Sequence, residues 1–534
     1  MKNNKYVISI AAVVALGGFL FGFDAAVISG VISFIRPEFD LTDIQVGWVV
    51  SSLTLTSTIA MLVTGFLSDK YGRKPVLIAV GLLYAISALG SAFAPTYEFL
   101  VIARMLGGFA VGAALVTAPL YIAEVSPAES RGRMVSIQQL NIVLGFSAAY
   151  FANYYILQLS KSPDVWVQDW GLATETWRWM LGLESIPAIL FFLAMFFVPE
   201  SPRWLLSNNR EEEANKTLEK INGKEQVGAV TAGILKTIEE DSKNKKLPIT
   251  ELFKPAMKFV LTIGLIVGIL QQITGINAVF FYANSIFEQS GIGQDASFAQ
   301  AVLVGLINVV FTILAMYLID RLGRKPLLLI GTAGIVISMA LTAYGFHQAT
   351  YTLTADKIET LSTDFDKKDS EEKDETKHVN FDKTAIAEMA GLTYDNDVAY
   401  KNELKSRMST IQYSKMESDF IQAAISMNPI LILIGILGFV ASFAISLGPV
   451  MWVLLSEIFP NRVRGLAISF VGFINSAVSW LIQQFFPWEL ANLGTALTFI
   501  IYGAFALIGF VLIYRMLPET KGKSLEEIEK EFVG

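Results

Sequence analysis

Residues 17–30 read Gly-Gly-Phe-Leu-Phe-Gly-Phe-Asp-Ala-Ala-Val-Ile-Ser-Gly and lie in a run from Tyr6 to Ile35 whose only charged residue is Asp24. About 20 apolar residues are enough to cross the hydrocarbon core of a bilayer, so this run predicts a first membrane helix. A carboxylate near the centre of such a helix costs about 2.5–3.5 kcal/mol and usually faces a partner or a water-filled path. Asp24 is therefore either a structural ion-pair residue or a proton site, and we favour the proton site.

The composition is that of a membrane protein. Hydrophobic residues make up 53% of the chain and charged residues 17%, against about 25% in an average soluble protein. The mean hydropathy is +0.51. The net charge of −7 gives no reason to expect a nucleic-acid partner. Because the chain contains no cysteine, disulfides, thiolate metal sites and cysteine nucleophiles are excluded.

Twelve runs with few or no charges are long enough to span a membrane. They are Tyr6–Ile35, Val46–Ser68, Val76–Tyr97, Phe99–Ala123, Met134–Leu159, Arg178–Val198, Phe259–Phe287, Phe298–Ile319, Leu327–Phe346, Ile421–Ser456, Gly465–Trp488 and Leu490–Tyr514. They predict an all-α membrane protein of twelve transmembrane helices in two pseudo-symmetric six-helix bundles. We place the bundles at 1–198 and 259–534 and a linker with short helices at 199–258. A charged insert at 347–425 and a short tail from 518 complete the chain.

Short basic loops predict the orientation. Loops rich in Lys and Arg lie at 69–74, 131–133, 320–325 and 462–464, all on one side of the predicted helices. The positive-inside rule makes that side cytoplasmic, together with the linker and both termini. We expect a multi-pass protein of the bacterial inner membrane. The insert should lie outside as a solvated segment, partly helical near Glu403–Phe420, and we favour a dispensable loop over a binding element.

The two halves share a repeated motif. Asp69-Lys-Tyr-Gly-Arg-Lys-Pro recurs as Asp320-Arg-Leu-Gly-Arg-Lys-Pro, and Glu124 with Arg131-Gly recurs as Glu457 with Arg464-Gly. A duplicated helical unit with a site between its halves is typical of secondary transporters.

Further stretches narrow this interpretation. They are Pro-Glu-Ser-Pro-Arg-Trp at 199–204, Gln-Gln-Ile-Thr-Gly-Ile-Asn at 271–277 and Pro-Glu-Thr-Lys-Gly at 518–522. Together with the repeated loops, they are similar to the sugar porter family of the major facilitator superfamily, which includes bacterial sugar–proton symporters. The resemblance implies the major facilitator fold and transport by alternating access.

The polar residues of the seventh run suit a sugar. A sugar offers hydroxyl groups and no charge, so a selective site needs several amides and an aromatic wall. Gln271, Gln272 and Asn277 interrupt an apolar run, and Gly275 between them can open the helix. Other runs supply further amides and an aromatic plate, namely Gln139, Asn308, Asn475 and Trp452. Each amide alone could simply join helices, but for the six together we favour a binding site.

The resemblance implies that these same residues contact the sugar, with Phe21 lining the pocket from the first helix. Two positions depart from the family pattern. Phe146 stands where a relative carries a second glutamine, and Asn475 is followed by Ser476 instead of tryptophan.

Arg104 is the expected partner of Asp24. Counted from the outer surface, the two residues differ in depth by about 6 Å at a rise of roughly 1.5 Å per residue, which an arginine side chain can span. Burial favours the protonated acid and Arg104 favours the carboxylate. Making and breaking this pair would therefore couple a proton to transport, as the resemblance also implies for both positions.

The remaining motif residues are acids and bases that we expect at the cytoplasmic helix ends. They are Asp69, Arg73, Glu124, Arg131 and Glu184 in the first half, and Asp320, Arg324, Glu457 and Arg464 in the second. The resemblance implies a network that closes the cytoplasmic side and breaks to open it. If these residues served only to orient the helices under the positive-inside rule, the Lys and Arg residues would be explained but the matched acids would not.

We therefore expect a secondary active transporter that imports a monosaccharide such as xylose or glucose with protons. A facilitative sugar carrier is the alternative, and a membrane sugar sensor is a weaker one because the tail from 518 is short. No nucleophile–base pair, metal cluster or phosphate loop indicates an enzyme or a cofactor. The expected partners are the monosaccharide, protons and the bilayer, with the chain acting as a monomer.

Overall fold

The computed structural model describes residues 4–127, 131–243, 247–371, 383–460, 462–523 and 527. Among these, twelve helical stretches are long and apolar enough to cross a membrane, as predicted. The first half contains α1 (Asn4–Glu38), α2 (Asp43–Tyr71), α3 (Arg73–Ala92), α4 (Tyr97–Val125), α5 (Arg131–Ser160), α6 (Val165–Asp169), α7 (Thr176–Leu183) and α8 (Ser185–Ala194). The second half contains α12 (Lys258–Ile273), α13 (Ile276–Phe281), α14 (Ala283–Glu288), α15 (Gly293–Leu322), α16 (Arg324–His347), α21 (Pro429–Ile445), α22 (Leu447–Ile458), α23 (Arg464–Asn492) and α24 (Thr495–Met516).

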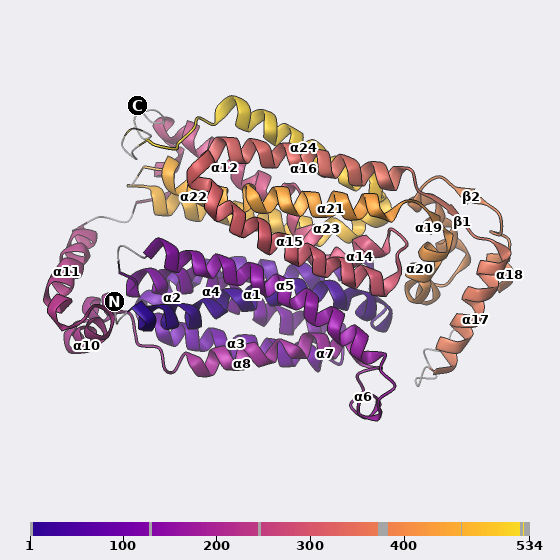
Figure 1. The fold of residues 1–534 in the computed structure, drawn as a ribbon, viewed down its shortest axis with the longest axis horizontal. Coiled ribbons are helices and arrows are strands. Elements are labelled where there is room, and N and C mark those ends of the chain that lie inside the picture. Colours follow the sequence, from indigo (N-terminus) through magenta and orange to yellow (C-terminus); the bar gives the residue numbers. More distant parts are fainter. Residues whose placement is uncertain are drawn as a thin grey trace.

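Short helices connect the halves at one end of the molecule. They are α9 (Pro202–Ser207), α10 (Glu211–Asn222), η1 (Lys224–Gln226), α11 (Val227–Lys243), η2 (Ile249–Phe253) and η3 (Pro255–Met257). Figure 1 shows α10 and α11 at this end, with both chain ends nearby. We call it the linker end.

The opposite end carries the described residues 347–371 and 383–425 and is called the insert end (Figure 1). The elements here are β1 (Thr350–Thr352), α17 (Ala355–Glu371), α18 (Lys383–Ala387), β2 (Thr393–Tyr394), α19 (Asp397–Arg407), α20 (Thr410–Ala424) and β3 (Ile425–Ser426). The strands form a small antiparallel sheet in the order β2-β1-β3. The expected helix near Glu403–Phe420 is present as the end of α19 and most of α20, but the described part of the insert is a folded lobe rather than a solvated loop.

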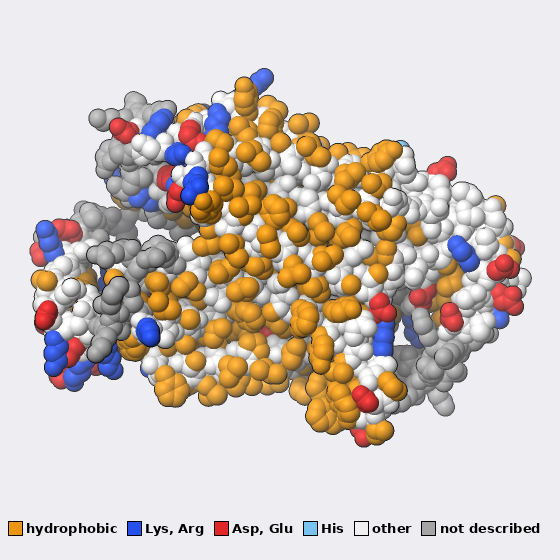
Figure 2. Space-filling model, in the orientation of Figure 1, with side chains coloured by type: hydrophobic (Ala, Val, Ile, Leu, Met, Phe, Trp, Pro, Cys, Tyr) orange, Lys and Arg blue, Asp and Glu red, His pale blue; other side chains and the backbone are white. Residues whose placement is uncertain are grey.

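The membrane helices pack as two bundles. In the first half α1 packs on α5, and α4 packs on α2 and α3, while in the second half α16 packs on α21 and α24. The bundles meet where α2 contacts α23 and α5 contacts α15. Figure 2 shows hydrophobic side chains over the middle of the molecule and charged side chains gathered at its two ends. That distribution suits a bilayer around the middle.

Candidate binding site between the two halves

The seventh span is broken at Gly275. Helix α12 ends at Ile273 and α13 begins at Ile276, and Gly275 between them has a φ of 88°. This left-handed conformation favours glycine. A Cβ atom here would also lie 2.5 Å from the ring of Tyr502. The break therefore depends on glycine, and it lies among the amides singled out from the sequence.

Four of the predicted amides form one hydrogen-bonded network in the second half. Asn475 Nδ2 donates to Gln271 Oε1 at 2.8 Å, and Gln272 Nε2 lies 3.3 Å from both Gln271 Oε1 and Asn475 Oδ1. Asn277 Nδ2 donates to Gln272 Oε1 at 2.9 Å. Gln271 Nε2 donates to the Leu447 carbonyl at 3.0 Å, where α21 gives way to α22. The broken seventh span and α23 thus present amide groups to one place, beside the break between α21 and α22.

Three polar residues that the sequence analysis missed extend this network to the first half. Ser479 Oγ accepts from Asn277 Nδ2 at 2.6 Å and from Gln483 Nε2 at 2.8 Å. Thr54 Oγ1 of α2 donates to Gln483 Oε1 at 2.7 Å. Residues 475, 479 and 483 are spaced by four, which places them on one face of a helix. That spacing is the signal that could have identified Ser479 and Gln483.

An aromatic group joins the halves beside these amides. The ring of Phe146 on α5 lies 4.8 Å from that of Phe280 on α13 and 6.3 Å from that of Phe21 on α1. Both Phe146 and Phe280 are buried. The position where a relative carries glutamine thus adds an apolar wall to the space between the bundles.

Three predicted sugar contacts stand apart from the amide network. Gln139 is exposed on α5, and Trp452 is 45% exposed on α22, where it packs against Gly472. Asn308 is buried in α15. Within the described residues, no hydrogen bond joins these three to the four connected amides. Their role in sugar binding remains a prediction.

Asp24 and Arg104 form a buried ion pair, as expected from their depths. Arg104 Nη1 lies 3.0 Å from Asp24 Oδ1, and Arg104 Nε donates to the Val49 carbonyl at 2.9 Å. The residues are only 3% and 1% exposed. Asp24 Oδ2 accepts no hydrogen bond from the described residues. Gly107 makes room for this oxygen, since a Cβ atom there would lie 3.0 Å from it.

The expected placement of Glu184 at a cytoplasmic helix end is wrong. Glu184 lies between α7 and α8, within the sixth span, and is 4% exposed. Its charge interacts with those of Asp24 and Arg104. The physical reason is depth in the membrane. Glu184 and Arg104 lie about the same number of residues after the start of their spans, so the two residues reach a similar depth. The buried charge cluster therefore contains two acids and one base.

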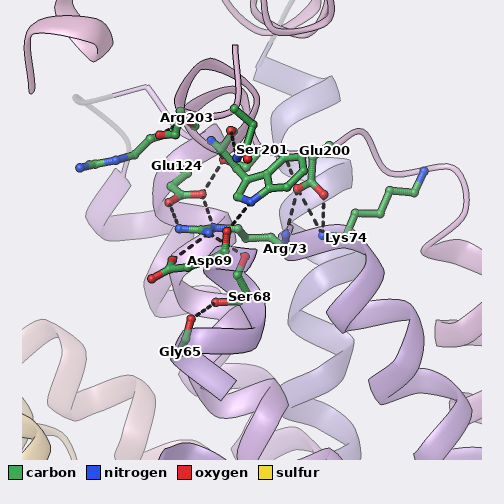
Figure 3. Close-up of polar contacts among 12 residues, drawn as sticks. Gly65, Ser68, Asp69, Arg73, Lys74, Glu124, Glu200, Ser201 and Arg203 are labelled. Atoms are coloured by element: carbon green, nitrogen blue, oxygen red, sulfur yellow. Dashed lines mark hydrogen bonds and ion pairs between the residues drawn. The ribbon is translucent and has the colours of Figure 1, made fainter. Parts of the chain in front are cut away.

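A second charge network, at the linker end, lies within the first half (Figure 3). Arg73 Nε and Nη2 donate to the two oxygens of Glu124 at 3.1 and 2.9 Å, and Arg73 Nη1 lies 3.1 Å from Asp69 Oδ1. Glu200 accepts from the backbone N–H groups of Arg73 and Lys74. Burial raises the pKa of Glu200, and these backbone donors offset part of that rise. The side chain of Arg131 lies outside the described residues.

The second half repeats this arrangement. Arg324 Nη2 lies 2.7 Å from Glu457 Oε1 and 3.5 Å from Asp320 Oδ1, while its backbone N–H donates to Glu519 at 3.0 Å. Arg464 Nε donates to the Phe459 carbonyl. Glu200 and Glu519 thus occupy matching places, in the motifs at 199–204 and 518–522. The sequence analysis assigns neither residue to the network. In this conformation Arg73 and Arg324 each pair within their own half.

Hydrogen bonds between the halves lie toward the insert end. Ser29 Oγ donates to Asn284 Oδ1 at 2.7 Å, Ser51 Oγ donates to Gln484 Oε1 at 2.7 Å, and the Tyr150 hydroxyl donates to the Phe280 carbonyl at 2.6 Å. Figure 1 shows the two groups of helices close together at this end and diverging toward the linker end. The molecule is therefore held shut at the insert end.

Two six-helix bundles around a polar, aromatic-lined site define a major facilitator transporter. The family model for "Sugar (and other) transporter" matches residues 10–360 and 409–532. The chain belongs to this sugar transporter family.

Individual relatives cover nearly the whole chain. The arabinose-proton symporter of Bacillus subtilis (strain 168) is 34% identical over 99% of this chain and 95% of its own length. The D-xylose-proton symporter of Escherichia coli (strain K12) is 32% identical, with 99% and 96% covered. The inward open structure of the xylose transporter XylE from E. coli is 29% identical, covers 99% of this chain and 100% of that one, and has a TM-score of 0.73.

Proposed function

We propose that this chain is a proton symporter that imports a monosaccharide by alternating access. Xylose, arabinose and glucose are the first sugars to test, because relatives carry those sugars in their names. The observation that carries the proposal is the buried Asp24–Arg104 pair, which lies in the same molecule as a connected set of amides suited to hydroxyl groups.

The sugar would take hydrogen bonds from the amide network and pack on aromatic rings. Amides can both donate to and accept from sugar hydroxyls, and an aromatic face suits the apolar face of a sugar ring. Gln271, Gln272, Asn277 and Asn475 supply the amides in the described network. Phe21 lies at the edge of the aromatic group, and Gln139, Asn308 and Trp452 complete the proposed set.

The proton would bind Asp24. In this conformation the Asp24 carboxylate pairs with Arg104 through one oxygen, and the other oxygen accepts no hydrogen bond from the described residues. Protonation would remove the charge that holds Arg104 and leave Glu184 as the neighbouring acid. Because a buried charge without a partner is costly, the proton would change which conformation is favoured. We therefore add Glu184 to the proton-coupling residues.

The linker end would face the cytoplasm of a bacterial cell, because the basic loops gather there. The present conformation would then face inward, as does the inward open xylose transporter structure that it resembles. The Arg73 and Arg324 networks would regroup when the halves close at this end. The halves would have to separate at the insert end to admit sugar.

Labelled-sugar uptake into proteoliposomes tests the proposal. An inward proton gradient should drive accumulation in the wild type. Asp24→Asn should abolish accumulation but retain exchange of sugar across the membrane, and Asp164→Asn, which removes an exposed carboxylate, should behave as the wild type. If the wild type only equilibrates the sugar and ignores the gradient, the chain is a facilitative carrier and Asp24 is structural.

A further inference from the structure

The insert is a lobe with its own apolar core. Tyr351, Leu361, Ile386, Tyr400 and Phe420 are buried in it. Strand β1 pairs with β3, so the chain enters and leaves the lobe at neighbouring points beside α16 and α21. The family model matches no residue from 361 to 408, which all lie inside the lobe. The middle of the lobe thus lies outside the match to the family, whereas its two ends, 347–360 and 409–425, lie within it.

Asp397 attaches the lobe to the second half. Its Oδ2 atom accepts from the backbone N–H of Thr495 at 3.0 Å and from the Thr495 hydroxyl at 2.8 Å, at the start of α24. A carboxylate is favourable at the N-terminus of a helix. Lys401 lies 3.5 Å from the same oxygen, and both charged residues are buried. The lobe should therefore move with the second half.

Arg36 attaches the lobe to the first half. Arg36, in the last turn of α1, lies 3.1 Å from Glu417 Oε2 of α20 and 2.7 Å from Asp43 Oδ1 of α2. Burial alone would raise the pKa of Glu417, but Arg36 and Lys401 outweigh it and hold that pKa below its ordinary value. Glu417 is therefore a carboxylate at neutral pH, and its pair with Arg36 crosses between the halves.

Alternating access requires the halves to separate at the insert end, which would pull α1 away from the lobe. We propose that the lobe, in its described residues 347–371 and 383–425, forms a latch that holds the insert end shut through the Arg36–Glu417 ion pair. This inference rests on the alternating access of the proposed function. The pair is partly exposed, at 23% and 13% of the two side chains. Its loss should therefore change the ratio of shut to open molecules by about fivefold.

The absence of cysteine makes this ratio measurable. Glu98 on α4 and Asn492 on α23 are exposed, belong to different halves and lie at the insert end. Glu98→Cys and Asn492→Cys therefore give two unique sites for spin labels in the full chain, held in lipid nanodiscs. Pulsed electron spin resonance then reports a short distance for the shut state and a longer one for the open state.

Glu417→Gln should raise the open-to-shut ratio about fivefold. Glu403→Gln is the matched control, because Glu403 pairs with Arg407 inside the lobe at 2.7 Å. It should leave the distances unchanged. An equal response of both variants, or no response to Glu417→Gln, would overturn the proposal.

Arg36→Gln tests the same pair from the other half and serves if the Glu417 variant does not fold. The double variant Arg36→Gln/Glu417→Gln should shift the ratio no further than Arg36→Gln alone, whereas additive shifts would contradict a shared pair. The spin-label distance measurements require neither sugar nor a proton gradient. If the variants show the expected shifts but the wild type takes up no sugar, the proposed function is disproved while the latch stands.

Discussion

Glu288 should make the closure of the insert end depend on pH. It ends α14, between two membrane spans, and is 9% exposed. Ser33 Oγ of α1 donates to its two oxygens at 3.0 and 3.2 Å across the contact between the halves, and Ser297 Oγ lies 3.4 Å from one of them. Burial raises the pKa of Glu288 to about 7, and the nearby acids Glu417 and Asp419 add to the rise.

The sign of the effect follows from the change in exposure. When the halves separate, water reaches Glu288 and its pKa should fall toward the ordinary value of 4.5. Below pH 4.5 Glu288 is protonated in both the shut and the open state, so the balance between the two states does not change with pH there. Between 4.5 and about 7 the shut state binds more protons, so raising the pH weakens it. Above pH 7 the stabilisation of the shut state by protonated Glu288 is lost completely. The difference between a pKa of about 7 and one of 4.5 corresponds to about 3–4 kcal/mol, or a factor of about three hundred in the ratio of shut to open molecules.

The spin-label pair on α4 and α23 measures this titration directly. The experiment is best made in the Asp24→Asn background, which removes the proposed proton site. The open fraction should rise from pH 4.5 to 7 and then level off, and adding Glu288→Gln should flatten the curve. Ser476→Ala, a substitution away from this contact, is the control and should keep the curve. The reasoning would be refuted if the open fraction still changed with pH after Glu288→Gln was added, or if it did not change with pH in the Asp24→Asn protein itself.

Three further substitutions test the site and the linker-end network. Gly275→Ala should cost about 1–2 kcal/mol for the left-handed backbone alone, with added strain against Tyr502. The midpoint temperature of thermal unfolding should therefore fall and sugar binding should weaken. An unchanged midpoint temperature would contradict this prediction. Ser479→Ala removes the acceptor shared by Asn277 and Gln483, so titration calorimetry should show about tenfold weaker sugar binding, and equal affinity would argue against the network. Glu124→Gln weakens the two-point pairing with Arg73, so the transport rate should fall while sugar affinity stays within about twofold. An unchanged rate would remove Glu124 from the mechanism.

The spans and the central charge pair could be predicted because the membrane imposes simple rules. Apolar runs of sufficient length identify the helices, and a charge inside such a run needs a partner at similar depth. Asp24 and Arg104 satisfy both rules. The broken seventh span could also be anticipated, since Gly275 lies between amides in an apolar run.

Other features depend on contacts that the sequence does not display. The assignment of Glu184 to the linker end came from its grouping with motif residues, although its depth matched that of Arg104. The core of the lobe at the insert end joins residues from Ala349 to Ala424, which come from several short elements. The Arg36–Glu417 pair links residues far apart in the chain. Such pairings follow only from the tertiary structure.

Sugar-dependent proton movement is the most direct test of proton symport. Sugar is added to proteoliposomes in a lightly buffered medium without an imposed gradient, and the external pH is recorded. We predict that xylose, arabinose or glucose makes the medium more alkaline with the wild type, and that Asp24→Asn abolishes this change while sugar exchange continues. Sugar entry without any pH change in the wild type would contradict the proposed coupling.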